Sequence, residues 1–294
     1  MNNHRKEARM NTPNYANPEV LVTTDWVAQH LGDKNIRLIE VDVDTTQYEN
    51  GHIRGAIGWN WQTQLQDPVR RDIISQQQLE GYLSQAAITD STTIVLYGDN
   101  NNWFAAYAFW LLQYYGHTKV KLMNGGRKKW LAENREITTE APSYLATKYQ
   151  VKKLEPTLRA TREYVFNILG KKSFALVDVR SVDEYTGKVI APPGMTETAQ
   201  RGGHIPGARN IPWSQAVNED GTFKSFNDLK ALYEGKGITS DKDEVVAYCR
   251  IGERSSHSWF VLKHLLGYQK VRNYDGSWTE WGNLVNAPIE KDVS

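Results

Sequence analysis

A single cysteine followed by a short charged loop is the part of this sequence best suited to chemistry. Cys249 comes directly after the apolar run 245–248, and residues 255–267 have the apolar spacing of a helix. Between them lies a loop of six residues, Cys249-Arg250-Ile251-Gly252-Glu253-Arg254. A strand, a tight loop and a helix in this order place the sulfur outside the carboxyl end of a strand, where open α/β sheets bind ligands.

The chemistry expected of this loop is nucleophilic attack by a thiolate. Backbone N–H groups of a tight loop that enters a helix converge on an anion, and the helix dipole adds positive charge at the same place. Arg250 and Arg254 add two formal positive charges. A free thiol has a pKa of about 8.5, and such surroundings lower it. We therefore predict that Cys249 is a nucleophile with a lowered thiol pKa, and not the buried, inert cysteine that is usual for a lone Cys.

Length, charge and cysteine content exclude several classes of function. The chain has 294 residues, enough for about two domains, and its net charge of +1 gives no support for binding nucleic acid or a membrane surface. Because Cys249 is the only cysteine, no intrachain disulfide or cysteine metal cluster can form, and we expect no metal or cofactor. A sulfur atom placed on Cys249 must therefore leave to an outside acceptor. Residues 1–15 do not have the pattern of a secretory signal, and no apolar stretch reaches the ~18 residues of a spanning helix, so we expect a cytoplasmic enzyme.

Strand and helix patterns alternate along the chain, and the order occurs twice. From Tyr97 onward the two series keep an offset of 151 residues, which indicates an internal duplication. We predict an α/β fold of two tandem domains, each with a mainly parallel sheet and helices on both faces. The predicted boundaries are a disordered tail at 1–15, a non-catalytic domain at 16–138, a linker at 139–161 and a catalytic domain at 162–294.

The two copies differ at the cysteine loop. Gly98 aligns with Cys249, and Asp99 aligns with Arg250. The first copy therefore has no nucleophile, and the charge of its loop is inverted. We expect the first domain to form a wall of the cleft without doing chemistry.

Other shared or inserted residues are predicted to have structural roles. His52 and His204 occur in both copies, including the one without a cysteine, which favours a role in fixing a turn. Asp42 and Asp178 are also shared and are predicted to brace loops. Residues 188–201 are an insertion in the second copy and are predicted to be a surface loop near the cleft, where contact with the substrate and contact with the first domain are both open.

The sequence resembles the tandem-domain rhodaneses, the thiosulfate sulfurtransferases, from about Val20 to Gly282. The resemblance rests on three motifs, which are Gly203-His204-Ile205-Pro206-Gly207-Ala208, Cys249-Arg250-Ile251-Gly252-Glu253-Arg254-Ser255 and Asp275-Gly276-Ser277-Trp278. It implies two rhodanese-like domains and a ping-pong cycle. In that cycle the Cys249 thiolate takes the outer sulfur of thiosulfate, sulfite leaves, and cyanide or a thiol takes the sulfur from a Cys249 persulfide. A protein could also be the sulfur acceptor.

The same resemblance implies roles for individual residues. Cys249 would be the nucleophile, backbone N–H groups of residues 250–254 would stabilise the persulfide, and Arg250 and Arg254 would attract the dianionic donor. Some family members have a donor-binding arginine four residues after the position of Arg180; here that residue is Glu184, so Arg180 is only a secondary candidate for substrate binding. An inward-facing Glu253 would raise the thiol pKa, so we predict that Glu253 points out to water.

Three alternatives remain to be weighed against this reading. A cysteine phosphatase or arsenate reductase of related fold needs five residues between Cys and Arg, whereas Ser255 occupies the required position here. Mercaptopyruvate sulfurtransferases have small, uncharged residues after the cysteine, and two arginines fit a small dianion better than a keto acid. Loss of the cysteine would mark a non-enzymatic binding module, but Cys249 is present. The predicted function is therefore a sulfurtransferase of the thiosulfate:cyanide type, with mercaptopyruvate sulfurtransferase as the alternative.

Overall fold

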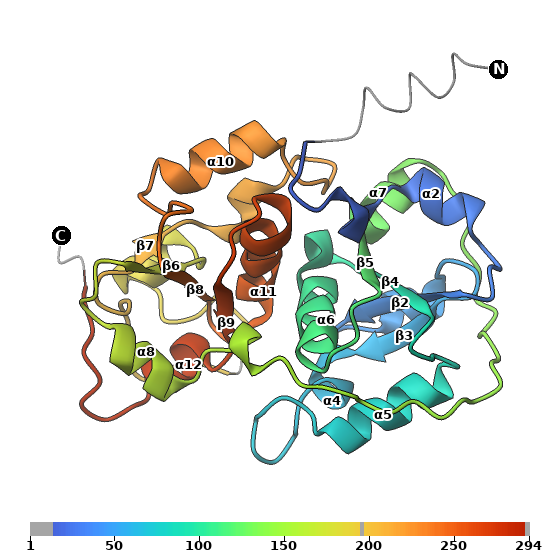
Figure 1. Cartoon of the computed structure of the whole chain (residues 1–294), viewed down its shortest axis with the longest axis horizontal. Helices are drawn as coiled ribbons and strands as arrows, with labels where there is room; N and C mark the ends of the chain where they lie inside the picture. The colour runs from blue at the N-terminus through green and yellow to red at the C-terminus, as the bar shows by residue number, and fades with distance from the viewer. Residues whose placement is uncertain (1–13, 195–196, 292–294) are drawn as a thin grey trace.

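Two α/β domains lie side by side in the structure, a computed structural model that describes residues 14–194 and 197–291 (Figure 1). All neighbouring strands in both sheets run parallel, as predicted. The first sheet has the order β1-β5-β4-β2-β3, and the second has the order β7-β6-β8-β9. The strands are β1 (Leu21–Val22), β2 (Ile36–Asp42), β3 (Ile57–Asn60), β4 (Thr93–Tyr97), β5 (Val120–Met123), β6 (Phe174–Asp178), β7 (Arg209–Asn210), β8 (Glu244–Tyr248) and β9 (Val271–Tyr274).

Helices connect the parallel strands, as crossover connections require. The α-helices of the first domain are α2 (Thr24–Gln29), α3 (Thr46–Asn50), α4 (Trp61–Gln64), α5 (Gln76–Gln85), α6 (Trp103–Tyr114) and α7 (Gly126–Ala132). Those of the second domain are α8 (Arg162–Ile168), α9 (Val182–Thr186), α10 (Phe226–Glu234), α11 (Glu253–Phe260) and α12 (Ser277–Trp281). The shorter turns are the 3-10 helices η1 (Pro18–Val20), η2 (Asn100–Asn102), η3 (Pro156–Leu158) and η4 (Trp213–Ala216), and the π-helical η5 (Val261–Leu265).

The duplication is visible in matching contacts. Tyr97 at the end of β4 accepts a hydrogen bond from the backbone N–H of Ile53 at 3.2 Å, and Tyr248 at the end of β8 accepts one from Ile205 at 3.1 Å. The predicted turn-fixing role of the two histidines is confirmed. The Nδ1 atom of His52 lies 2.9 Å from a backbone carbonyl oxygen of α3, and Nδ1 of His204 lies 2.9 Å from one of α9.

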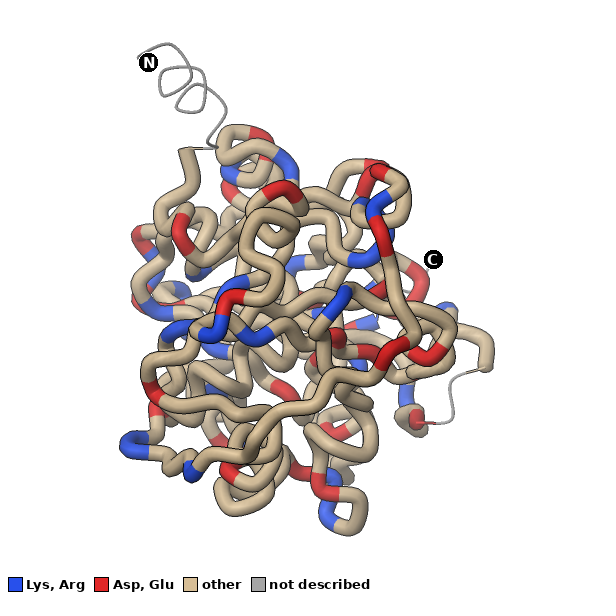
Figure 2. Tube along the Cα trace, turned by 90° about the vertical axis from the view of Figure 1, so that its right-hand side faces the viewer, with Lys and Arg blue, Asp and Glu red and all other residues tan. Residues whose placement is uncertain are grey.

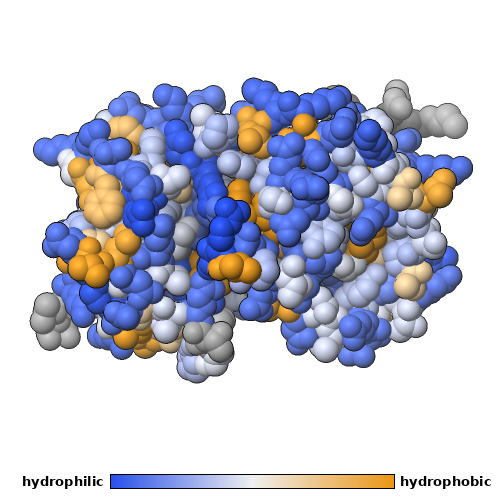
Figure 3. Space-filling view, turned by 90° about the horizontal axis from the view of Figure 1, so that it is seen from below, coloured by the Kyte–Doolittle hydropathy of each residue, from blue (hydrophilic) through white to orange (hydrophobic). Residues whose placement is uncertain are grey.

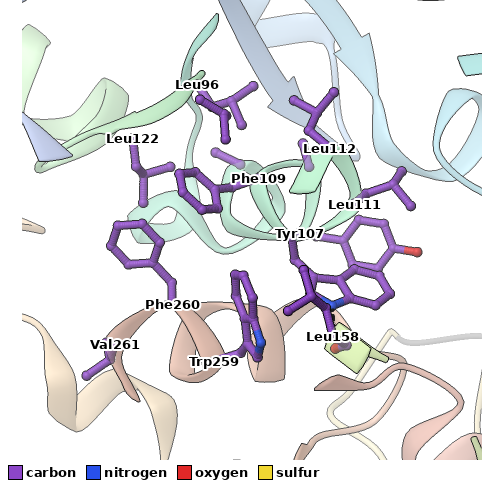
Figure 4. Packing of buried hydrophobic residues seen from close by; sticks show 14 of the residues in the cluster. Leu96, Tyr107, Phe109, Leu111, Leu112, Leu122, Leu158, Trp259, Phe260 and Val261 are labelled. Atoms are coloured by element: carbon purple, nitrogen blue, oxygen red, sulfur yellow. Dashed lines mark hydrogen bonds between the residues drawn. The ribbon is translucent and has the colours of Figure 1, made fainter. Parts of the chain in front are cut away.

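One of the hydrophobic clusters contains buried residues from both domains. Helices α6 and α11 lie next to each other at the boundary, and their apolar side chains point toward one another (Figures 1 and 4). The rings of Phe109 and Phe260 pack edge to face, with centroids 4.9 Å apart and an interplanar angle of 87°. Trp103 and Trp213 add a second aromatic contact between the domains at 5.2 Å. Because α11 begins at the cysteine loop, this core gives that loop a rigid support.

The start of the described chain also belongs to this assembly. Most of the predicted tail, residues 1–13, lies outside the described residues. Tyr15, which was predicted to be in the tail, is instead buried, and its hydroxyl donates a hydrogen bond to the carbonyl of Lys224 at 2.8 Å. The other predicted domain boundaries stay predictions.

The sides of the molecule seen in Figures 2 and 3 carry charged and apolar residues that are mixed. Basic and acidic residues alternate along the trace of the side seen in Figure 2. On the face seen in Figure 3, apolar residues form small separate patches beside a strongly hydrophilic strip near the middle. Within the described part of the chain, no helix has both the length and the apolar character needed to cross a membrane.

Candidate active site

The cysteine loop lies where the sequence analysis predicted it. Strand β8 pairs with β6 on one side and with β9 on the other, and Cys249 follows its last residue. Helix α11 begins at Glu253, so four residues turn the chain from the strand into the helix. Cys249 itself is fully buried, with an exposed fraction of 0%.

Two hydrogen-bond donors lie next to the sulfur atom. The backbone N–H of Gly252 donates to Sγ of Cys249 at 3.1 Å, and the hydroxyl of Ser255 lies 3.6 Å from Sγ. The hydroxyl oxygen of Ser277 lies 4.0 Å from Sγ, but its proton is donated to the carbonyl of Tyr274. Such donors stabilise a negative charge on sulfur more than they stabilise a neutral thiol.

The loop needs glycine at position 252. Gly252 has a φ of 101°, which L-residues with a side chain rarely adopt. A Cβ atom at this position would lie 2.8 Å from Cα of Asp275. The absence of a side chain therefore lets the N–H of Gly252 approach the sulfur.

Two buried polar residues, Ser277 and Asn273, form hydrogen bonds with the backbone of the cysteine loop. Ser277 accepts a hydrogen bond from the backbone N–H of Cys249 at 3.0 Å and donates one to the carbonyl of Tyr274 at 2.7 Å. Its φ of 52° lies in the left-handed region, so its backbone is strained to bring the hydroxyl to this place. Asn273 donates to the carbonyl of Gly252 at 3.2 Å and lies 2.6 Å from the Ser255 hydroxyl.

The prediction that Glu253 points out to water is wrong. Glu253 is only 2% exposed, and the thiol of Cys249 donates to its Oε2 atom over 3.4 Å. Two features of the loop favour a buried carboxylate here. The residue is the first of α11, where the helix dipole favours a negative charge, and Nε of Arg254 lies 3.7 Å from Oε1 of Glu253.

The predicted lowering of the thiol pKa is also wrong, first because the sulfur is buried. Burial and then the charge of Glu253 raise the pKa of the Cys249 thiol, and the opposing charge of Arg254 does not compensate. The sulfur of Cys249 and the carboxyl group of Glu253 thus share a hydrogen bond inside the site.

Both loop arginines are held by other groups. Arg254 forms a two-point ion pair with Glu184, with N–O distances of 2.9 and 3.0 Å. Burial raises the pKa of Glu184, but the hydrogen bonds and charge of Arg254 outweigh it, so this pKa is lowered overall. Arg250 is buried and donates through Nη1 to the carbonyl of Glu197.

Arg180 is fully buried behind the loop. Its guanidinium forms a two-point ion pair with Asp178, donates to the carbonyl of Gly203 at 2.7 Å, and lies 4.6 Å from the ring centroid of Trp278. These contacts join β6 to the segment that carries His204, which confirms the bracing role predicted for Asp178. The structure thus gives Arg180 a bracing position next to the site.

The first domain and the insertion reach the loop together. Arg71 of the first domain donates to the carbonyl of Ile251 at 3.4 Å and forms an ion pair with Glu197 at 2.5 Å. Glu197 belongs to the predicted insertion 188–201, which therefore contacts both the first domain and Arg250. A cavity of about 500 Å³ lies at this junction, lined by residues that include Arg71, Arg159, Glu197 and Asp275. A second cavity, of about 730 Å³, lies in the first domain, and none of its lining residues belongs to the cysteine loop.

The equivalent loop of the first domain is closed. A Cβ atom at Gly98 would lie 2.4 Å from the backbone oxygen of Val41, so no side chain fits there without a shift of the backbone. The backbone N–H of Asp99 donates to Asp42 at 2.9 Å, which confirms that Asp42 braces this loop. Burial, and then the charge of Asp99, raises the pKa of Asp42 to about 8. The loop is acidic where the second domain has arginines.

Several contacts of the site were not assigned a role in the sequence analysis. Ser277 could have been found by comparing the two copies, because it aligns with Gly126, which has a similar φ of 57°. A serine that replaces glycine at a left-handed position indicates that its hydroxyl is used. Arg71 and Glu197 carry no comparable signal, because their pairing depends on how the two domains pack.

Comparisons with known proteins agree with this architecture. A family model described as "Rhodanese-like domain" matches residues 23–133 and 161–284. The chain is 56% identical over 282 residues to "Sulfur carrier protein TtuD" of Thermus thermophilus, with 94% of this chain and 98% of that protein covered. It is 52% identical over 287 residues to a protein of Haloferax volcanii named "Putative thiosulfate sulfurtransferase", with 96% and 99% covered.

Solved structures share the fold. The structure of an EanB variant in complex with ergothioneine has a TM-score of 0.83 and 25% sequence identity, and the match covers 95% of this chain and 71% of that chain. The crystal structure of YnjE has a TM-score of 0.85 at 24% identity, with 95% and 70% covered.

Proposed function

Since the chain belongs to the rhodanese-like domain family and carries two copies of the domain, we propose that it is a thiosulfate sulfurtransferase whose second domain does the chemistry. Cys249 is the nucleophile and the carrier of the transferred sulfur. The observation that supports this most directly is the difference between the two loops. One holds a sulfur atom 3.1 Å from the N–H of Gly252, and the other has no room for a side chain at Gly98.

The proposed cycle has two half-reactions. Sγ of Cys249, as a thiolate, attacks the outer sulfur of thiosulfate, and the S–S bond of thiosulfate breaks with its electron pair leaving on sulfite. A persulfide remains on Cys249, and its negative charge is stabilised by the N–H of Gly252. Cyanide or a thiol then attacks the outer sulfur of the persulfide, and the electron pair returns to Sγ. Thiocyanate or a new persulfide leaves.

The loop arginines favour a small dianionic donor. Arg250 directly follows Cys249, and Arg254 is the second residue of α11. Arg254 pairs with the carboxylate of Glu184, and Arg250 donates to the carbonyl of Glu197. The 3-mercaptopyruvate alternative keeps Cys249 and its persulfide and replaces only the donor.

The proposal also has to name the molecule that accepts the sulfur from Cys249. The name of the Thermus relative favours delivery of sulfur to another molecule in a relay, and a protein thiol would serve as the acceptor in that case. We propose a thiol acceptor in a cytoplasmic setting, with cyanide as the convenient acceptor in an assay.

The test uses the presence of a single cysteine. Purified protein incubated with thiosulfate should gain one sulfur atom by mass spectrometry, and adding cyanide should remove it and release thiocyanate. Cys249→Ser should do neither. Comparing thiosulfate with 3-mercaptopyruvate under the same conditions identifies the donor. Thiocyanate formation by Cys249→Ser at the parental rate would overturn the assignment of Cys249, and faster loading from mercaptopyruvate would overturn that of thiosulfate.

A further inference from the structure

We propose that Glu253 is the proton carrier of this site: its carboxylate takes the thiol proton when Sγ of Cys249 attacks and returns it when the transferred sulfur leaves. The proposal rests on the sulfur-transfer function proposed above and adds a second catalytic residue to it. The geometry points to Glu253 because it is the carboxylate that the structure places in hydrogen-bond contact with the reacting atom, at 3.4 Å from Sγ.

The burial of Glu253 requires an explanation. A carboxylate next to a sulfur that must become negative opposes the reaction by charge repulsion, and burying a charge is costly unless it is paired. Arg254 offsets part of this cost at 3.7 Å, but Arg254 is already engaged by Glu184. A carboxylate in this position is useful if it becomes neutral at the moment when the sulfur becomes charged.

In this proposal, Cys249 and Glu253 share one proton. Thiol with carboxylate and thiolate with carboxylic acid are two arrangements of the same proton, and their ratio does not depend on pH while the pair holds one proton. The reactive arrangement has a neutral Glu253, so a dianionic donor meets one negative charge on Sγ and none on the carboxyl group. The attack breaks the S–S bond of the donor, and its electron pair leaves on sulfite while the proton stays on Glu253. When an acceptor removes the outer sulfur, the electron pair returns to Sγ, which takes the proton back.

Other charged groups around the loop keep their own partners during this exchange. These are Arg254 with Glu184 from α9, Arg250 with the carbonyl of Glu197, Arg71 with Glu197, Arg159 with Asp275, and Arg180 with Asp178 from β6. In each described ion pair the acid faces an arginine. Of these groups, Glu253 alone shares a hydrogen bond with the thiol.

The experiment measures the rate of sulfur loading from thiosulfate in a single turnover as a function of pH. The parent enzyme should show a nearly flat rate across neutral pH. Glu253→Gln has the same shape but no base, so its thiolate can form only by losing a proton to water. We therefore expect its rate to lose the flat profile and to rise about tenfold per pH unit until its thiol is ionised. Glu234→Gln removes an equal charge from the surface of α10 and should keep the parental profile.

A purely electrostatic Glu253 gives a different pair of profiles. The parental rate itself would then rise about tenfold per pH unit, and Glu253→Gln would keep this slope and shift it to lower pH, because removing a neighbouring anion lowers the thiol pKa. A tenfold rise per pH unit in the parent overturns the proposal. Alkylation of Cys249 by iodoacetamide, a neutral electrophile, should give the same pair of profiles. This second readout tests Glu253 even where thiosulfate fails to load sulfur, which is a failure of the proposed function alone. Thermal unfolding confirms that each variant is folded.

Discussion

Ser277 offers a quantitative test of how the cysteine loop is held. Its hydroxyl accepts the hydrogen bond from the backbone N–H of Cys249, and its own φ of 52° is unfavourable for a residue with a Cβ atom. Two substitutions separate these contributions. Ser277→Ala removes the hydroxyl and keeps the backbone strain, whereas Ser277→Gly removes both.

The expected magnitudes follow from burial. Cys249 and Ser277 are both fully buried, so loss of the hydroxyl leaves a buried N–H unpaired at a cost of about 2 kcal/mol. Relief of the left-handed backbone returns about 1 kcal/mol in the glycine variant. Ser277→Ala should therefore lower the free energy of unfolding by about 2 kcal/mol and Ser277→Gly by about 1 kcal/mol. In a chain of this size, the difference corresponds to about 2 °C in the midpoint of thermal unfolding.

Urea and thermal unfolding measure the stability difference, and sulfur loading from thiosulfate measures the chemistry. Both variants lose the same support for Cys249, so both should load sulfur about tenfold more slowly, which corresponds to about 1.4 kcal/mol of barrier. Gly126→Ala is the matched control, because Gly126 has the equivalent left-handed position in the first domain. It should be destabilised and should load sulfur at the parental rate. A Ser277→Gly variant no more stable than Ser277→Ala would refute the strain argument.

Two further substitutions test other parts of the structure. Gly98→Cys should lower the unfolding midpoint by several degrees, because its Cβ would meet the oxygen of Val41, and in the Cys249→Ser background it should not accept sulfur by mass spectrometry; sulfur on residue 98 would contradict the closed first loop. His257 is fully buried, and burial lowers its pKa to about 3, whereas the unfolded chain binds this proton near pH 6.5. Its contribution to stability is therefore complete above pH 6.5 and is lost as the pH falls toward 3, by about 1.4 kcal/mol per pH unit. His257→Leu should flatten the acid side of the stability profile by that amount in urea titrations between pH 7 and 5, and an unchanged slope would show that His257 is protonated in the folded state.

Local patterns predicted the fold well, because each strand and helix depends on neighbours in the sequence. The apolar run 245–248 lies in β8, and the cysteine loop begins directly after this strand, as the apolar pattern indicated. The constant offset between the two copies identified the loop that has Gly98 in place of a cysteine. The roles of His52 and His204 followed from the same comparison.

Charge orientation at the site was not predictable in the same way. The sequence showed that Glu253 and Arg254 are neighbours, but their directions depend on Glu184, which is 70 residues away from Arg254 along the chain. Burial of the sulfur is the main reason why the thiol pKa rises instead of falling. The charge of Glu253 adds to it, and Arg254, which Glu184 engages, does not compensate. The contact of Arg71 with Ile251 depends on the packing of the two domains, which no local pattern specifies.

The edge-to-face pair at the domain boundary has a consequence for how the chain is organised. Phe109 and Phe260 are separated by the same 151 residues that relate the two copies, so a residue meets its own counterpart across the boundary. A self-complementary contact of this kind is the signature of an isologous two-fold dimer. The packing at this boundary therefore resembles that of a homodimer joined into one polypeptide. Because the two halves differ in sequence, one loop can lack a cysteine while the helix beside it still packs against the helix that begins at the other loop.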